Sequence, residues 1–324
     1  MATLNSVFTI NDLKTYLISE VRRELGNVVP LVERIASQEP VDKGTKTVRK
    51  VIRARIGKMY DVDTAAYPAT AGYKPVTPTV GPILEYGATG KAIFSSVYNV
   101  DEFHHGQRSL VVSDIAKAAA NELNRHAIAR LEGALTKSVT YTQGDGTSRT
   151  SNLFAVSGSP WYTKAGTAVS NVVSAALSAS SLDTAITRRQ TAINWEDDTP
   201  MNPPMANNMF LFVPPALRSL AEIITGAPAL PLTTLSILGD SVTGDVMNVL
   251  TKHNIVPVVV PDFSSATAAY LVDGASMPMS YAVFTPLDLE VVQKAAPQAY
   301  EISATMEIGA ELNPYEFGAI RIAA

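Results

Sequence analysis

Residues 107–138 read QRSLVVSDIAKAAANELNRHAIARLEGALTKS, the longest uninterrupted helical pattern in the chain. The stretch contains no proline, and its apolar residues recur at steps of three and four, as along one face of an α-helix: Val112, Ala116, Ala119, Leu123, Ala127, Leu131 and Leu135, widened by Ile115 and Ile128. A helix of about 28 residues is roughly 42 Å long. This length favours an extended subunit organised around one rod. The alternative is a long core helix of an ordinary α/β or α+β domain.

Composition sets limits on what the chain does. A chain of 324 residues buries a large core and normally divides into about two domains. Its net charge of −4 provides no global positive field for nucleic acid or acidic membranes. The absence of cysteine excludes disulfides, thiolate metal sites and a cysteine nucleophile. Residues 1–36 lack a signal-peptide pattern and no apolar run is long enough to cross a bilayer, so we expect a soluble protein made inside the cell.

Two segments before the rod are expected to act as arms. Leu13, Leu17, Val21 and Leu25 stand at helical spacing, which predicts an N-terminal helix that packs on something beyond its own local core. The alternative is the first helix of a domain. Residues 43–58 then change to a period of two and form a strand with one cationic face, followed by a turn-rich tip at 61–82 and a returning strand pattern at 83–100.

This β-arm has too little core to be stable alone, so we expect it to lie on a neighbouring subunit. Seven basic residues occur between Asp42 and Asp61 without an acid: Lys43, Lys46, Arg49, Lys50, Arg53, Arg55 and Lys58. Contact with nucleic acid is a weaker interpretation, because base-stacking aromatics are not interleaved with these cations. A solvated strand face is the alternative to both.

The rest of the chain predicts a separate module and a closing strand pair. Residues 160–290 alternate helix and strand patterns, with strands expected at 209–213, 255–260, 269–273, 280–284 and 287–293 and helices at 181–194 and 216–225. Residues 300–322 alternate again with a break at 311–315, and are expected to return to the domain that holds the rod. That domain is then discontinuous in sequence.

No pattern of catalysis or of cofactor or metal binding occurs. His104 and His105 are adjacent and therefore diverge, and the acids at 196–198 point in different directions. The chain has no GxSxG, P-loop or GxGxxG motif. We expect neither an enzyme nor a cofactor site.

The order of these parts resembles the major capsid proteins of tailed double-stranded-DNA bacteriophages, which have the Hong Kong-97-type fold. The resemblance is carried by VVSDIAKAA at 111–119, FLFVPPAL at 210–217 and ELNP at 311–314. It implies an α+β fold with an N-arm (1–42), an extended β-arm (43–100), a peripheral domain (101–160 and 294–324) with the spine helix, and an α/β axial domain (161–293).

The implied function is assembly of pentamers and hexamers into an icosahedral shell around phage DNA, held without sequence specificity. Contacts between subunits are expected at Arg49, Lys50, Arg53, Arg55, Lys58, Tyr67, Tyr73, Leu13 and Leu17. Implied partners are further copies, together with scaffold, portal and decoration proteins, and no membrane. The implied location is the virion capsid, after synthesis in the cytoplasm of a host bacterium. The alternatives are an encapsulin-like nanocompartment shell and a nucleic-acid-binding module that uses residues 43–58.

Overall fold

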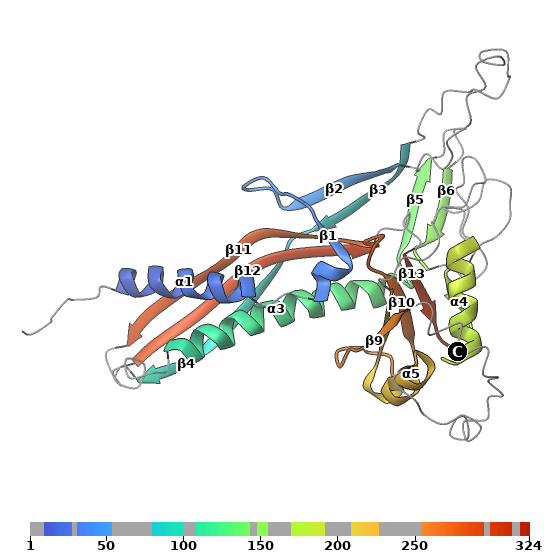
Figure 1. Ribbon diagram of the computed structural model, residues 1–324. Coiled ribbons are helices and arrows are strands. Elements are labelled where there is room, and N and C mark those ends of the chain that lie inside the picture. Colours follow the sequence, from blue (N-terminus) through green and yellow to red (C-terminus); the bar gives the residue numbers. More distant parts are fainter. Residues whose placement is uncertain are drawn as a thin grey trace, which may run out of the picture.

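The computed structural model describes residues 10–27, 31–53, 80–99, 108–142, 148–154, 170–191, 209–226, 254–294, 299–312 and 318–324. In these ranges the chain forms an elongated body, a second lobe at one end of it, and a two-stranded arm above it (Figure 1). The mixture of helices with several sheets confirms the α+β class.

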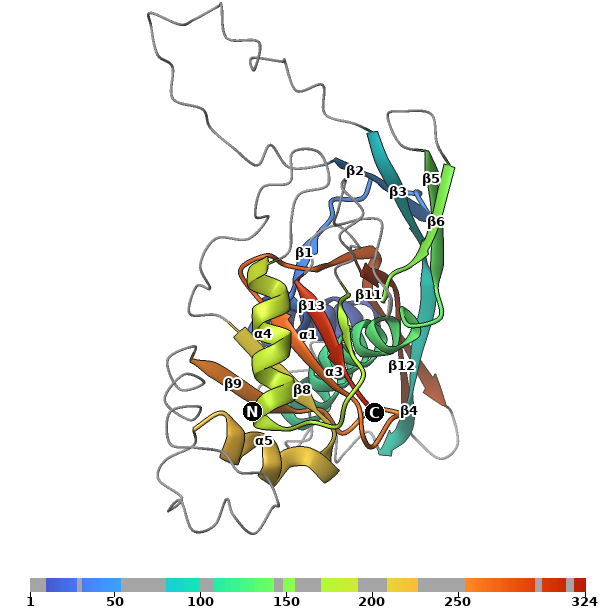
Figure 2. The same cartoon turned by 90° about the vertical axis from the view of Figure 1, so that its right-hand side faces the viewer.

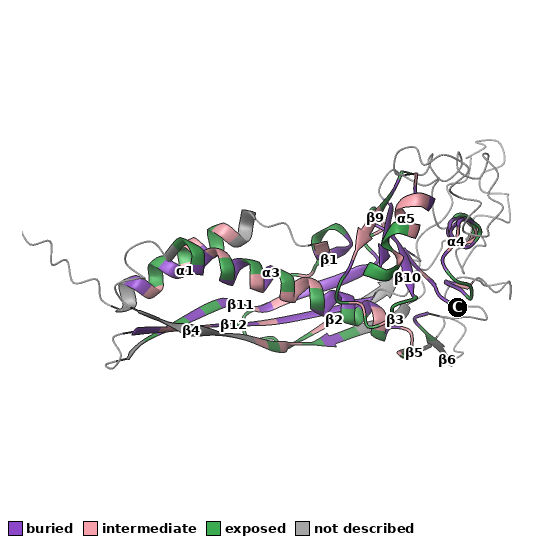
Figure 3. Cartoon of the chain, turned by 90° about the horizontal axis from the view of Figure 1, so that it is seen from below, coloured by how far each residue is buried: buried purple, intermediate pink, exposed green. Residues whose placement is uncertain are grey.

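A four-stranded sheet forms the floor of the body. Its order is β1 (Ala36–Gln38), β11 (Met279–Lys294), β12 (Ala299–Leu312) and β4 (Thr89–Asn99). β12 runs antiparallel to both of its neighbours, whereas β1 runs parallel to β11. The helices α1 (Ile10–Asn27) and α3 (Arg108–Gly133) lie on one face of this sheet, and the short helix η1 (Leu31–Arg34) follows α1 (Figure 3). The body sheet is therefore covered on one side.

The rod predicted at 107–138 is α3, and its apolar stripe is the buried face. Ala116, Ala119 and Leu131 are each at most 2% exposed, while Lys117 and Arg125 on the opposite side are exposed. The first half of α3 packs with α1 on β11 and β12 in one hydrophobic core. The helical period decides this packing, because it places every third or fourth side chain on the sheet.

The second lobe contains a five-stranded mixed sheet covered by helices. The sheet order is β7 (Val172–Val173), β13 (Ala319–Ile322), β10 (Ala269–Asp273), β8 (Met209–Val213) and β9 (Ile255–Val259), and the helices are α4 (Ala179–Thr191), η3 (Pro215–Leu217) and α5 (Arg218–Ile224). The side chains of β8 alternate between two cores. Leu211 and Val213 join α4 and α5, whereas Phe210 and Phe212 face α3.

The second half of α3 belongs to both lobes. Ala127, Ile128 and Leu131 pack against Phe210 of the five-stranded sheet and, in the same core, against Leu312 of the body sheet. One helix thus connects the two sheets (Figure 2).

The arm consists of β2 (Thr47–Arg53) paired antiparallel with β3 (Val80–Gly87). A second hairpin, β5 (Ser138–Thr142) with β6 (Ser148–Asn152), follows α3. The hairpin predicted for the arm is present in its described part, but the returning strand expected at 83–100 divides at Ala88. Residues before Ala88 pair with β2, and residues after it form β4 of the body sheet.

Two strands lie in sheets other than those predicted. Residues 280–284 and 287–293 were expected as two strands of the axial module, yet both belong to one strand, β11, in the body sheet, with irregular register around Pro286. The closing strand β13 was expected beside the spine helix with β12, but it pairs with β10 in the second lobe. The expectation for the closing pair is therefore right for β12 and wrong for β13.

Candidate assembly surface

The base of the arm is bound to its own chain by ion pairs. Arg49 stands opposite Glu85 in the β2–β3 register, and its Nε donates to the carboxylate at 3.0 Å. Lys50 Nζ donates to Glu39 Oε1 at 2.5 Å. Both pairs are at least partly exposed, so each contributes about 0.2–1 kcal/mol. Two of the predicted contact residues therefore have part of their charge neutralised within the subunit.

Lys46, just before β2, reaches the body sheet and pairs with Glu307 of β12. The Thr285 hydroxyl donates to the same carboxylate. These two hydrogen bonds, with that of Lys46 the stronger influence, lower the pKa of Glu307 below its ordinary value. Glu307 therefore stays ionised and holds the root of the arm to the sheet at neutral pH.

Below the arm lies a buried polar cluster. The Ser280 hydroxyl donates to the Tyr86 hydroxyl at 3.1 Å, and burial raises the pKa of Tyr86 to about 12. The side chain of Glu311, 2% exposed, is paired with Lys137 from the segment after α3. These contacts connect β3, both central body strands and the segment after the spine helix at one point, so the arm leaves the body from a fixed base.

Gly309 of β12 allows the arm to come this close to the sheet. A Cβ at this position would lie 2.8 Å from the Gly87 carbonyl oxygen and 2.8 Å from the Phe284 ring. Neither neighbour has room to withdraw, because the first is backbone and the second is a buried ring. The absence of a side chain here is a packing requirement.

We expect Gly309→Ala to destabilise the subunit by about 1–3 kcal/mol, the usual cost of overpacking a core. Chemical unfolding of the dissociated subunit measures this cost. Gly90→Ala is the matched control, since a Cβ there meets nothing within 4 Å. Equal stability of the two variants would show that the base of the arm is not tightly packed on β12.

The predicted contacts of the N-terminal helix are wrong. Leu13 and Leu17 were expected to bury their side chains on a neighbouring subunit, but they are 3% and 1% exposed within this chain. Both join the core formed by α3 and the body sheet. The amphipathic pattern predicted a buried face and could not say which surface covers it.

The remaining predicted contacts belong to the arm. Arg53 ends β2, and the structure describes its backbone only. Four others lie outside the described residues: Arg55, Lys58, Tyr67 and Tyr73. The structure thus brings Arg49 and Lys50 together at the base of the arm and leaves the distal residues as predictions.

The face of the body sheet that none of the described helices covers was not predicted from the sequence. Val292 stands opposite Glu301 in the register of β11 and β12, so both point to the same side, as does Glu290 two residues earlier. Glu290 is exposed, and Val292 is 46% exposed. On the other side, Val291 and Ile302 are buried under the helices. The alternation along 287–292 and 300–308 is the signal that could have identified this acidic open face.

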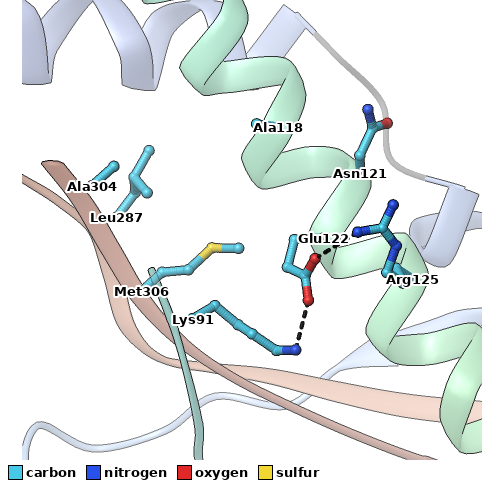
Figure 4. A pocket seen from close by; sticks show the side chains of 8 residues that line it. All are labelled: Lys91, Ala118, Asn121, Glu122, Arg125, Leu287, Ala304 and Met306. Carbon is cyan, nitrogen blue, oxygen red and sulfur yellow. Dashed lines mark hydrogen bonds and ion pairs between the residues drawn. The ribbon is translucent and has the colours of Figure 1, made fainter. Parts of the chain in front are cut away.

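A pocket of about 390 Å³ lies between α3 and the body sheet (Figure 4). Lys91 of β4 pairs with Glu122 of α3 at 2.6 Å, and Arg125 approaches the same carboxylate at 3.4 Å. The Lys91–Glu122 pair fastens the edge of the sheet to the spine helix, whereas Arg125 and Glu122 both belong to that helix. No three acidic or histidine side chains of the described ranges meet as metal ligands would. None of the described helices is long and apolar enough to span a membrane.

Residues 105–320 match the family model described as phage capsid protein. The chain is similar to the capsid structure of the cyanophage P-SCSP1u, with a TM-score of 0.51 and 12% identity over 91% of this chain and 88% of that one. It is also similar to the capsid of Ralstonia phage GP4, with a TM-score of 0.51 and 13% identity over 90% and 87% of the two chains. No curated protein sequence matches it.

Proposed function

The chain belongs to the phage capsid protein family, and we propose that it closes its shell through rings of five and six subunits joined by the β-arm. It is a major capsid protein with the Hong Kong-97-type fold, a structural component of the virion that assembles with copies of itself into an icosahedral shell. Its body corresponds to a peripheral domain, its second lobe to an axial domain, and the arm to the extended loop. Its role is structural, not catalytic.

The observation that supports the role of the arm is the charge of the open sheet face. Glu290 and Glu301 lie there beside the exposed apolar Val292, and the described base of the chain's own arm contacts this face at Glu307, six residues further along β12. The arm carries the opposite charge, with Arg53, Arg55 and Lys58 beyond the intramolecular pairs. An arm from a neighbouring copy would therefore meet both complementary charge and an apolar contact.

The family match favours a shell around DNA over an encapsulin-like compartment. A nucleic-acid-binding arm is less favoured, because Arg49 and Lys50 are already paired with acids. A subunit with a net charge of −4 suits a container that holds DNA without tight or sequence-specific binding. Scaffold, portal and decoration proteins complete the proposed partners, and synthesis takes place in the cytoplasm of the host bacterium.

Sedimentation and negative-stain electron microscopy of the purified protein test the assembly itself. We expect megadalton particles or rings of subunits. A clean monomer under every assembly condition would overturn the proposal.

Charge reversal tests the contact between arm and sheet. We expect Glu290→Lys with Glu301→Lys to prevent particle formation while the subunit stays folded, because the open face then repels the neighbour's arm. Sedimentation velocity measures assembly, and circular dichroism measures folding. When the charge of the arm is reversed as well, by Arg53→Glu with Arg55→Glu, particle formation should be restored.

The matched control is Asp114→Lys, an exposed acid of the same body on its helical side. Normal assembly of the sheet-face variant, or failure of the arm reversal to restore it, would contradict the proposed contact.

A further inference from the structure

The segment 262–265 connects the two lobes through polar contacts. It follows β9 at the edge of the five-stranded sheet and lies against the second half of α3. Arg125 Nε donates to Asp262 Oδ1 at 3.2 Å. Two turns further along the helix, Glu132 accepts hydrogen bonds from the Ser264 and Ser265 backbones. We call these two contacts the lobe latch.

Glu132 is held by an unusual number of donors for a side chain that is only partly buried. The Ser264 N–H lies 3.1 Å from each carboxylate oxygen, and the Ser264 hydroxyl donates at 3.0 Å. The Ser265 N–H donates at 3.3 Å. Glu132 is the penultimate residue of α3, where the helix dipole disfavours a carboxylate. The donors from the loop offset this cost, so the side chain stabilises the position of the loop and does not stabilise its own helix.

The geometry of the lobe latch fixes how the 262–265 loop is oriented relative to α3. Arg125 and Glu132 are seven residues apart, which places them on the same side of α3 and about 10.5 Å apart along its axis. Two anchor points of opposite charge fix both the position and the direction of the loop. The apolar core beside them, formed by Leu131, Phe210 and their neighbours, depends mainly on buried area and tolerates small rotations. Hydrogen bonds are directional, so they weaken when the two lobes rotate relative to each other.

We propose that Arg125 and Glu132 are positioning residues that set the angle between the two lobes and thereby the curvature and size of the shell. This inference rests on the proposed function. A rotation of about 5° at the junction displaces the far end of α3, a rod roughly 39 Å long, by about 3 Å. Repeated in every subunit, such a displacement changes how tightly the shell curves. The contacts are surface contacts, so they affect orientation more than stability.

Particle diameter measured by electron microscopy tests the latch. We expect Glu132→Gln, which replaces one acceptor oxygen with an amide that faces N–H donors, to shift the diameters or split them into several classes. Arg125→Glu, which repels Asp262, should do the same, and adding Asp262→Arg should move the diameters back. The melting temperature of the dissociated subunit should change little.

Asp114→Asn is the control, an exposed acid of the same helix outside the latch. Particles of unchanged diameter from both latch variants would overturn the inference and leave the shell function intact. Failure of the unmodified protein to form particles would instead overturn the assembly proposal itself. A diameter shift without recovery in the charge-swapped pair would show that Arg125 acts through Glu122 and not through Asp262, which overturns its place in the latch.

Discussion

Arg189→Met is expected to destabilise the subunit by about 3–5 kcal/mol, the usual cost of removing one member of a buried ion pair. Arg189 of α4 pairs with Asp273 at the end of β10, and their side chains are 5% and 8% exposed. Without the guanidinium, the carboxylate stays buried in the second lobe and keeps the Ala275 N–H as a donor at 2.8 Å. Urea unfolding of the dissociated subunit measures the loss.

Two further variants test the cause of that loss. Arg189→Met combined with Asp273→Leu removes both charges and should recover much of the stability, because the cost arises from the unpaired carboxylate. Arg218→Met breaks the exposed pair with Glu222 on α5 and should leave stability almost unchanged. If Arg189→Met behaved like Arg218→Met, the pair would contribute no more than a surface contact.

Shortening the arm is expected to abolish stable particles and leave the subunit folded. Arg53 and Val80 stand opposite each other in the β2–β3 register, so residues 54–79 can be replaced by Asn-Gly, the preferred two-residue hairpin turn. The three described hydrophobic cores form without this segment. The shorter deletion of 64–78 should weaken particles to a smaller degree.

Sedimentation velocity and electron microscopy measure the particles, and thermal unfolding tests whether the subunit is intact. Particles as abundant and as stable as those of the full-length chain would refute the role assigned to the arm. An unfolded subunit would show instead that the arm contributes to its own chain's core.

Local sequence patterns correctly predicted the helices and strands that have a clear apolar periodicity. The unbroken three-and-four spacing around Ala116 and Leu131 identified α3, and the apolar residues of β8 and β10 identified both strands with their observed bounds. In each case one face, or both, is buried by a large apolar surface. The residue pattern then has a single low-energy arrangement.

The choice of partner was not predictable from local pattern. The strand pattern at 83–100 is continuous, yet the chain changes sheets at Ala88, where Gly87 passes over Gly309. The pattern predicted two strands, 280–284 and 287–293, but Pro286 between them lies in the irregular register between Thr285 and Asp288 of one long strand. Proline is tolerated at such a bulge because no ladder hydrogen bond is needed there.

The candidate surface was predicted in part for the same reason. The alternation of cationic and apolar residues identified β2 and its basic face, because both the charge and the period of two can be read from neighbouring residues. The acidic open face depends on which side of the body sheet the helices cover, and Leu13 and Leu17 show that α1 covers it from within the same chain. The alternation along β11 and β12 marks an acidic face and an apolar face, but tertiary packing decides which of the two the helices cover.

The position of β13 has a consequence for how the chain is made. This strand, Ala319–Ile322, inserts between β7 and β10, and so the sheet of the second lobe stays incomplete until residues 319–322 have left the ribosome. The body sheet likewise waits for β12. Closure of both sheets therefore depends on contacts between segments far apart in sequence, which form slowly. A polypeptide that stops before β12 lacks a finished sheet in either lobe, and we expect such a copy to be unable to join the shell.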